Sequence, residues 1–165
     1  MLGNYTLLEA EAQMDTLRNL YPSFVSQKDS IGTTIEGRTI WAFKVSDNPG
    51  IDEDEPEVLY TGLTHAREPL SMMNLYYFVR WLCENYSYDV TARFLVDNRE
   101  MWFVPIINPD GYVYNETIAP NGGGMHRKNR RPNPNNSNCN NGTQQGVDLN
   151  RNYSYNWGAN NSGSS

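Results

Sequence analysis

Two polar side chains three residues apart supply the first candidate for chemistry. His65 and Glu68 directly follow residues 58–61, a short apolar run typical of a buried strand. An imidazole nitrogen and a carboxylate oxygen both bind zinc at about 2.1 Å, and catalytic zinc sites use three protein ligands with water in the fourth position. The spacing alone is weak evidence, because a partly exposed histidine beside a solvated glutamate gives the same pattern. The pair therefore predicts two of the three ligands of a zinc site.

Asp148 is a candidate partner for His65. It is the only acid in residues 120–165, and a metal-binding histidine usually donates its second ring N–H to a carboxylate. An ordinary turn or cap aspartate explains Asp148 equally well. Ligands of open α/β sheets collect in the loops after the carboxyl ends of strands. We therefore expect His65, residues 108–110 and residues 148–151 to line one crevice.

Unpaired positive charges form a second group of candidates. Arg67 lies inside the metal motif, and a region with almost no compensating acid contains Arg127, Lys128, Arg130, Arg131 and Arg151. A guanidinium matches a carboxylate through two parallel hydrogen bonds and also stabilises an oxyanion that forms beside a metal. The end of a peptide chain is such a carboxylate. A solvated basic loop explains Arg130 and Arg131 equally well, so we assign them no role.

Composition limits the partners that these charges serve. Residues 120–165 contain five Lys and Arg against one acid, but the whole chain has a net charge of −6 and a pI near 4.8. Nucleic-acid-binding domains are normally basic overall, so an anionic small group is the expected partner and nucleic acid is not. The sequence has no run of eighteen apolar residues and no signal-peptide pattern at its start, so we expect no membrane partner. Cys83 lies in an apolar helical pattern and Cys139 in a polar loop, and we do not expect them to pair.

The elements that must position these residues follow from periodicity and turn signals. Residues 6–9 have the form of a capping box, and the helix they begin ends at Pro22. Further predicted elements are a hairpin of strands 30–35 and 39–45, a strand at 58–61, helices from Pro69 to about Asn85 and at 90–97, a buried strand at 101–107 and a long surface loop at 115–145. The order predicts one domain of the α/β class, with a mixed parallel and antiparallel twisted sheet and helices on both faces.

Five blocks in order along the chain resemble the zinc carboxypeptidases of the funnelin or carboxypeptidase A/T type. They are Ile31-Gly32 with Glu36-Gly37-Arg38, His65-x-Arg67-Glu68, Asn108-Pro109-Asp110-Gly111, Arg127-Lys128-x-Arg130, and residues 146–152. The resemblance extends from the helix that begins at Thr6 to Trp157. It implies that residues 1–165 form a single partial domain, the N-terminal part of a catalytic domain of this fold.

The resemblance also implies roles for particular residues. Zinc would be bound by His65 and Glu68, with Asp148 holding His65. Arg127 would polarise the scissile carbonyl, Asn150 and Arg151 would bind the terminal carboxylate of the substrate, and Arg67 would contact the peptide upstream of the cleaved bond. The implied activity is removal of C-terminal residues from peptides and proteins, by a secreted monomer.

The chain departs from the family pattern in two respects that matter for activity. The family's third zinc ligand, its late tyrosine and its general-base glutamate have no counterpart before Ser165, and His126 is better interpreted as an ordinary loop histidine. Glu68 is committed as a ligand and is not available as the base. We therefore predict negligible peptidase activity for these 165 residues alone. Two alternatives stay open: a non-catalytic binding module that retains the carboxylate cradle, and an amidase of the same fold acting on cell-wall peptides.

Overall fold

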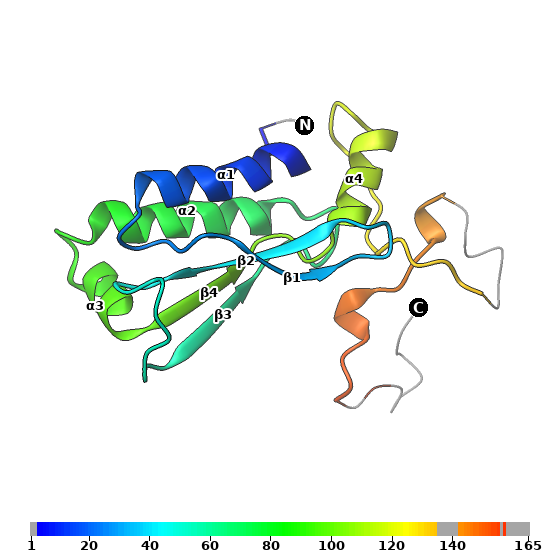
Figure 1. Ribbon diagram of the computed structural model, residues 1–165. Coiled ribbons are helices and arrows are strands. Elements are labelled where there is room, and N and C mark those ends of the chain that lie inside the picture. Colours follow the sequence, from blue (N-terminus) through cyan, green and yellow to red (C-terminus); the bar gives the residue numbers. More distant parts are fainter. Residues whose placement is uncertain (1–2, 135–141, 156, 158–165) are drawn as a thin grey trace.

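A four-stranded mixed sheet positions the candidate residues (Figure 1). The computed structural model describes residues 3–134, 142–155 and 157. The strands lie in the order β1 (Asp29–Thr33), β2 (Thr39–Val45), β4 (Glu100–Val104) and β3 (Glu57–Thr61). The β1–β2 and β2–β4 pairs are antiparallel and the β3–β4 pair is parallel, with Thr61 opposite Val104. The predicted mixed sheet is confirmed, and the carboxyl ends of β3 and β4 meet at one edge of it.

The predicted hairpin between β1 and β2 is also confirmed. Gly37 has a φ of +84°, a conformation that favours glycine because it has no Cβ atom. The Thr34 amide donates to the Arg38 carbonyl at 2.8 Å, and the Gly37 amide donates to the Thr34 carbonyl at 3.1 Å. The turn therefore fixes which residues of the two strands face each other.

Helices α1 (Leu7–Leu20) and α2 (Leu70–Asn85) pack together beside the sheet (Figure 1). The capping box at the start of α1 is present, because the Thr6 hydroxyl accepts from the Glu9 amide and the Glu9 carboxylate accepts from the Thr6 amide. Within the helix pair the Tyr76 hydroxyl donates to the Ala10 carbonyl at 2.8 Å. Of the leucine and methionine residues at helical spacing in α1, Leu7, Met14 and Leu17 are buried together with Ala10, whereas Leu8 and Leu20 are exposed.

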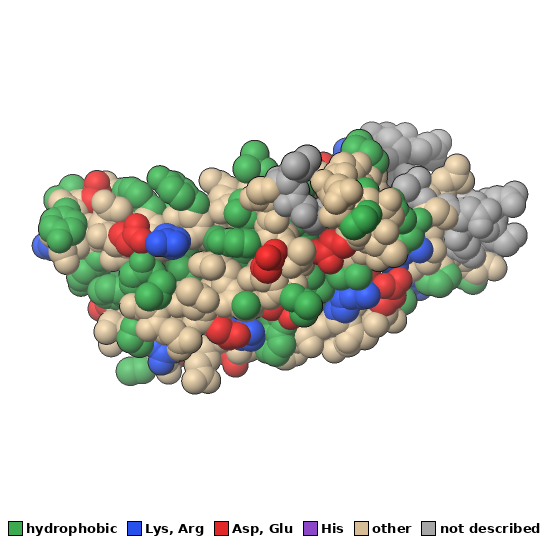
Figure 2. Space-filling view, turned by 90° about the horizontal axis from the view of Figure 1, so that it is seen from above, with side chains coloured by type: hydrophobic (Ala, Val, Ile, Leu, Met, Phe, Trp, Pro, Cys, Tyr) green, Lys and Arg blue, Asp and Glu red, His purple; other side chains and the backbone are tan. Residues whose placement is uncertain are grey.

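Aromatic rings stack across the neighbouring strands β2, β4 and β3, and Phe78 of α2 packs on them with its ring 5.5 Å from that of Tyr60. The rings of Phe43 and Phe103 stack at 5.4 Å between centroids, and Tyr60 stacks on Phe103 at 5.0 Å. The opposite side of β3 is more open, since Leu59 is 64% exposed. The predicted third helix is confirmed as α3 (Val90–Asn98), which packs against α2. In the view from above, basic and acidic side chains lie among each other rather than forming a basic patch (Figure 2).

A fourth helix, α4 (Pro109–Ile118), corrects the predicted loop at 115–145. Asn108 caps this helix, since its side-chain oxygen accepts from the Gly111 amide at 3.1 Å, and Pro109 occupies the first turn. Polar and glycine residues obscure the helical period of residues 109–118 in the sequence. The predicted strand at 101–107 is shorter, ending at Val104 before Pro105, which has no amide N–H to donate. Residues 119–134 form neither helix nor strand, as expected.

Within the described ranges, no helix combines the length and the apolar character needed to cross a membrane. Cys83 is buried in α2, and Cys139 lies outside the described residues.

Candidate metal centre and substrate site

The loop after β3 brings His65 to the edge where the two parallel strands end. Gly62 continues the ladder with β4, since its amide donates to the Val104 carbonyl at 3.0 Å. A Cβ atom at Gly62 would lie 2.7 Å from the Pro105 carbonyl oxygen, so only glycine fits there. The buried Leu63 next to it has a φ of +47°, a left-handed conformation that costs roughly 1 kcal/mol for a non-glycine residue. This strained turn redirects the chain toward the crevice.

Four side chains form a closed ring of polar contacts in this crevice. His65 Nδ1 lies 3.1 Å from Glu68 Oε2, and His65 Nε2 lies 3.1 Å from Asp148 Oδ1. Arg127 closes the ring, donating from Nε to Asp148 Oδ2 at 2.8 Å and from Nη1 to Glu68 Oε1 at 3.2 Å. The predicted convergence of residues 65, 68, 127 and 148 therefore occurs, although they come from three distant segments.

The His65–Glu68 pair fits two ligands of one zinc ion. Two atoms bound to a tetrahedral zinc at about 2.1 Å are about 3.4 Å apart, close to the 3.1 Å between Nδ1 and Oε2. A proton on Nε2, donated to Asp148, leaves the Nδ1 lone pair directed at the position shared with Glu68. The imidazole is buried, whereas the Glu68 side chain is 52% exposed. The pair is therefore ordered by its surroundings on the histidine side and open to solvent on the glutamate side.

Within the described part of the chain, no third metal-ligating side chain completes this pair. The one group of three such residues found there is Asp52, Glu57 and Glu100. Glu57 and Glu100 begin β3 and β4, so this acidic group lies at the opposite ends of the strands from His65. Glu100 is also engaged by the buried ammonium of Lys44. The two clusters are separate, and only the His65 cluster joins nitrogen and oxygen donors.

Charge holds Asp148 in its ionised form. Burial would raise the pKa of this carboxyl, but hydrogen bonds from Arg127 and His65 outweigh burial and lower the pKa below its ordinary value. Asp148 also caps the short helix η3 (Leu149–Arg151), accepting from the Asn150 amide at 3.0 Å. The two interpretations of this residue that the sequence left open are therefore both realised in one side chain.

The remaining predicted substrate-binding residues lie on the solvent side of the site. Asn150 and Arg151 are exposed on η3, and the Arg151 guanidinium donates to the Asn150 carbonyl at 2.9 Å. Arg67 is exposed and lines a pocket of about 150 Å³ together with residues 122–125. No ion pair within the described residues occupies the Arg67 guanidinium. These side chains are available to an anionic ligand, but they are attached to the four-residue ring through backbone only.

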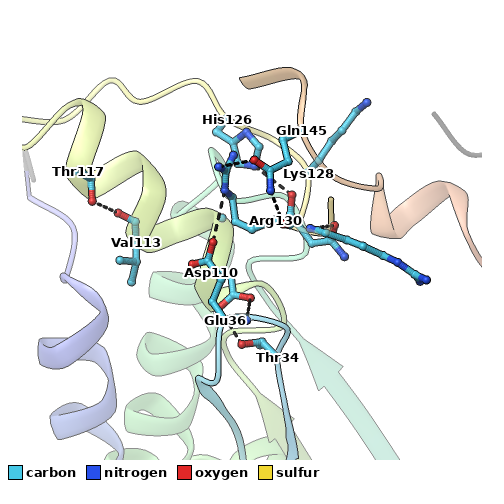
Figure 3. A network of polar contacts seen from close by, with 12 residues as sticks. Thr34, Glu36, Asp110, Val113, Thr117, His126, Lys128, Arg130 and Gln145 are labelled. Atoms are coloured by element: carbon cyan, nitrogen blue, oxygen red, sulfur yellow. Dashed lines mark hydrogen bonds and ion pairs between the residues drawn. The ribbon is translucent and has the colours of Figure 1, made fainter. Parts of the chain in front are cut away.

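Asp110 and Arg130 do not join the crevice and instead hold the surrounding frame (Figure 3). The buried Asp110 accepts from the Thr34 hydroxyl at 2.7 Å and from Arg38 at 2.8 Å, which ties α4 to the β1–β2 turn. Arg130, to which the sequence assigned no role, donates to Gln145 Oε1 at 2.7 Å and lies 3.8 Å over the Tyr114 ring. The expectation that all of residues 108–110 face the crevice is therefore wrong for Asp110, because the hairpin turn supplies its donors.

Sequence reasoning missed the part of α4 in the site. The side-chain amide of Asn108 donates to the Lys128 carbonyl at 2.9 Å. The side-chain amide of Asn115 donates to the carbonyls of Ala66 and His126, in the two loops that carry the ring. The only signal was their seven-residue separation, which places both on one helical face once α4 is known. His126, expected to be an ordinary loop histidine, is completely buried, with its ring edge-on to Tyr114.

Comparison with known proteins agrees with this geometry. The sequence model of a family described as zinc carboxypeptidase matches residues 10–165. The chain belongs to the zinc carboxypeptidase family. The chain is 37% identical over 156 residues to a zinc carboxypeptidase of Saccharothrix mutabilis subsp. capreolus, and 37% identical over 126 residues to metallocarboxypeptidase A of Trichophyton tonsurans. The predicted family is confirmed.

Solved structures confirm the carboxypeptidase-like fold as well. Carboxypeptidase A from Helicoverpa armigera superposes with a TM-score of 0.76 at 30% identity, over 95% of this chain and 35% of its own. Thrombin activatable fibrinolysis inhibitor superposes with a TM-score of 0.77 at 26% identity, over 93% of this chain and 35% of its own. The match covers 94% of this chain and 33% of the Saccharothrix relative, and 76% of this chain and 27% of the Trichophyton relative. The chain thus spans between 27% and 35% of the length of these relatives.

Proposed function

We propose that this chain contributes part of the active site of a zinc-dependent carboxypeptidase that hydrolyses the C-terminal residue of peptides or proteins. The observation that carries the proposal is the ring formed by His65, Glu68, Arg127 and Asp148. A structural ion-pair network would not require His65 Nδ1 and Glu68 Oε2 to face each other while a second carboxylate holds Nε2. That arrangement is what a metal-bound imidazole needs.

Each member of the ring has a distinct task in this proposal. His65 and Glu68 hold the zinc ion, which when bound polarises a carbonyl and acidifies water. Asp148 keeps the His65 proton on Nε2 and orients the Arg127 guanidinium with its other oxygen. Arg127, 25% exposed, presents its positive charge to an oxyanion that forms at the scissile carbonyl. Removing one such donor typically reduces kcat by a factor of about 10² to 10³.

The exposed cations next to the ring support a carboxylate-bearing substrate. Asn150 and Arg151 offer an amide and a guanidinium fork, which match the two oxygens of a peptide C-terminus. Arg67 belongs to residues 65–68, the metal loop. It lines the pocket shared with residues 122–125 and contacts the peptide upstream of the cleaved bond. The Saccharothrix, Trichophyton and Helicoverpa relatives are named carboxypeptidases, and those names support a C-terminal substrate.

We further propose that the 165 residues alone have negligible turnover. The described residues provide two of the three ligands expected of a catalytic zinc site, and Glu68 is engaged as one of them. A general base must be free to take a proton, so a metal-bound carboxylate does not serve. Weak zinc binding without catalysis is therefore the expected property of this chain.

Zinc affinity of matched variants tests the ligand assignment. Competition with a chromophoric chelator should show one zinc ion bound to the wild-type chain, and His65→Ala and Glu68→Ala should each weaken binding at least tenfold. The control is the double variant Asp52→Asn with Glu57→Gln, which neutralises the other acidic group and should leave the affinity unchanged. If the control loses zinc and the His65 and Glu68 variants retain it, the proposed metal site is wrong.

A further inference from the structure

Helix α4 presents two buried asparagine amides to the loops that carry the active-site ring. Asn108 caps the helix and Asn115 lies seven residues later, so two helical turns place them on the same face. Asn108 is 2% exposed and Asn115 is 3% exposed. A buried primary amide must find partners for its donors and its acceptor, so the identity of those partners reveals what the side chain holds.

Asn115 connects the metal loop directly to the arginine segment. Its Nδ2 donates to the Ala66 carbonyl at 3.0 Å and to the His126 carbonyl at 2.8 Å, and its Oδ1 accepts from the His126 amide at 2.8 Å. Ala66 lies between the two proposed zinc ligands, and His126 immediately precedes Arg127. One side chain therefore fixes the distance between residues 65–68 and residues 126–127.

The surrounding backbone approaches this amide closely. A Cβ atom at Gly124 would lie 2.7 Å from both Cβ and Oδ1 of Asn115. A Cβ atom at Gly111 would lie 2.5 Å from the Lys128 carbonyl oxygen and 2.8 Å from the Ala66 Cβ. Real Cβ contacts are never so short, so glycine is needed at both positions for α4 to touch the two loops.

Among the residues that the structure describes, a single backbone hydrogen bond joins residues 65–68 to residues 126–128 without α4. The Ala66 amide donates to the Arg127 carbonyl at 3.0 Å. Asn108 supports the same junction from the other side, donating from Nδ2 to the Lys128 carbonyl at 2.9 Å. The position of the Arg127 guanidinium opposite His65 and Glu68 therefore depends on contacts made by α4.

We propose that Asn115 is a positioning residue that clamps the His65–Glu68 loop to the Arg127 segment. The clamp itself follows from the hydrogen bonds, and its consequence for zinc and catalysis rests on the proposed function. An amide is required because Nδ2 faces two carbonyl oxygens while Oδ1 faces an N–H. A carboxylate would place an oxygen against the Ala66 and His126 carbonyls, and an apolar side chain would leave three buried backbone groups unpaired.

Amide hydrogen exchange measured by NMR tests the clamp without any need for zinc. Asn115→Asp keeps the acceptor for the His126 amide and removes both donors, so exchange at the Ala66 amide should accelerate at least tenfold relative to the slowest core amides. Gly124→Ala, which pushes against the Asn115 side chain without removing it, should accelerate the same amide and covers the case in which Asn115→Asp does not fold. The control Tyr76→Phe deletes a buried hydrogen bond to Ala10, far from both loops, and should leave Ala66 exchange unchanged.

Zinc competition on the same variants tests the functional consequence. Asn115→Asp and Gly124→Ala should weaken zinc binding about tenfold, and Tyr76→Phe should not change it. The clamp is overturned if Ala66 exchange in both test variants rises no more than in Tyr76→Phe. If the wild-type chain binds no zinc, the proposed function fails while the exchange result still decides the clamp. Unchanged zinc affinity with accelerated exchange overturns the positioning role.

Discussion

Replacing Asp148 with Asn removes the charge at the centre of the ring with almost no change in shape. Its carboxylate accepts from Arg127, His65 and the Asn150 amide, and its side chain is 9% exposed. An asparagine places an NH₂ group on one of the two oxygen positions, so a donor faces a donor whichever way it is oriented. Hydrogen bonds to charged groups contribute about 1.5–3 kcal/mol each, and solvent around the 25% exposed Arg127 reduces its share. We expect Asp148→Asn to lower the free energy of unfolding by about 2 kcal/mol at neutral pH, because these combined contacts are weakened.

The lowered pKa of Asp148 determines how the stability difference between wild type and Asp148→Asn varies with pH. Because the folded pKa of Asp148 is lowered, its charge stabilises the native state fully above the unfolded pKa of about 3.9 and loses this effect as the pH falls through the folded value. Urea unfolding of the metal-free chain, followed by tryptophan fluorescence, should show the largest gap between wild type and Asp148→Asn at neutral pH. The gap should shrink below about pH 4. In zinc competition, the same variant should bind about 10–100-fold more weakly.

A matched control separates this effect from loss of any acid. Asp15→Asn removes an exposed carboxylate that is 58% accessible and pairs with Lys28, and it should change the unfolding free energy by less than about 0.5 kcal/mol. The reasoning is refuted if Asp148→Asn behaves like Asp15→Asn. A gap that stays constant from neutral pH into the acid range would equally refute it, because the stabilisation would then not depend on the charge.

Three further predictions concern the frame around the site. Lys44→Met should destabilise the fold by about 3–5 kcal/mol in urea titrations, because it leaves the buried Glu100 carboxylate without its cation. Burial raises the pKa of the Cys83 thiol to about 12, so a thiol-specific reagent should label Cys83 in native protein only as fast as the chain unfolds. Gly111→Ala should lower the free energy of unfolding by about 1–3 kcal/mol, since the added Cβ would lie 2.5 Å from the Lys128 carbonyl oxygen. An unchanged melting temperature would contradict that close approach.

The sequence by itself determined the elements whose signals are local. A capping box at Thr6, a glycine turn at 36–38 and apolar runs at 58–61 and 101–107 act over a few residues, so the helix, the hairpin and the buried strands were predictable, although β4 ends at Val104. Motif spacing also predicted the pairing of His65 with Glu68, because three residues of chain keep the two side chains close whatever the rest of the fold does.

Only the tertiary structure decided which distant groups complete the site. Asp148 fitted a cap or a histidine partner equally well from sequence, and its place beside His65 depends on the parallel pairing of β3 with β4 and on the hydrogen bond from the Asn129 amide to the Val147 carbonyl. Asp110 and Asn115 both lie on α4, yet one faces the hairpin and the other the metal loop. Hydrogen-bond partners that lie 49 to 83 residues apart leave no local pattern, because their specificity arises from the packing that buries them.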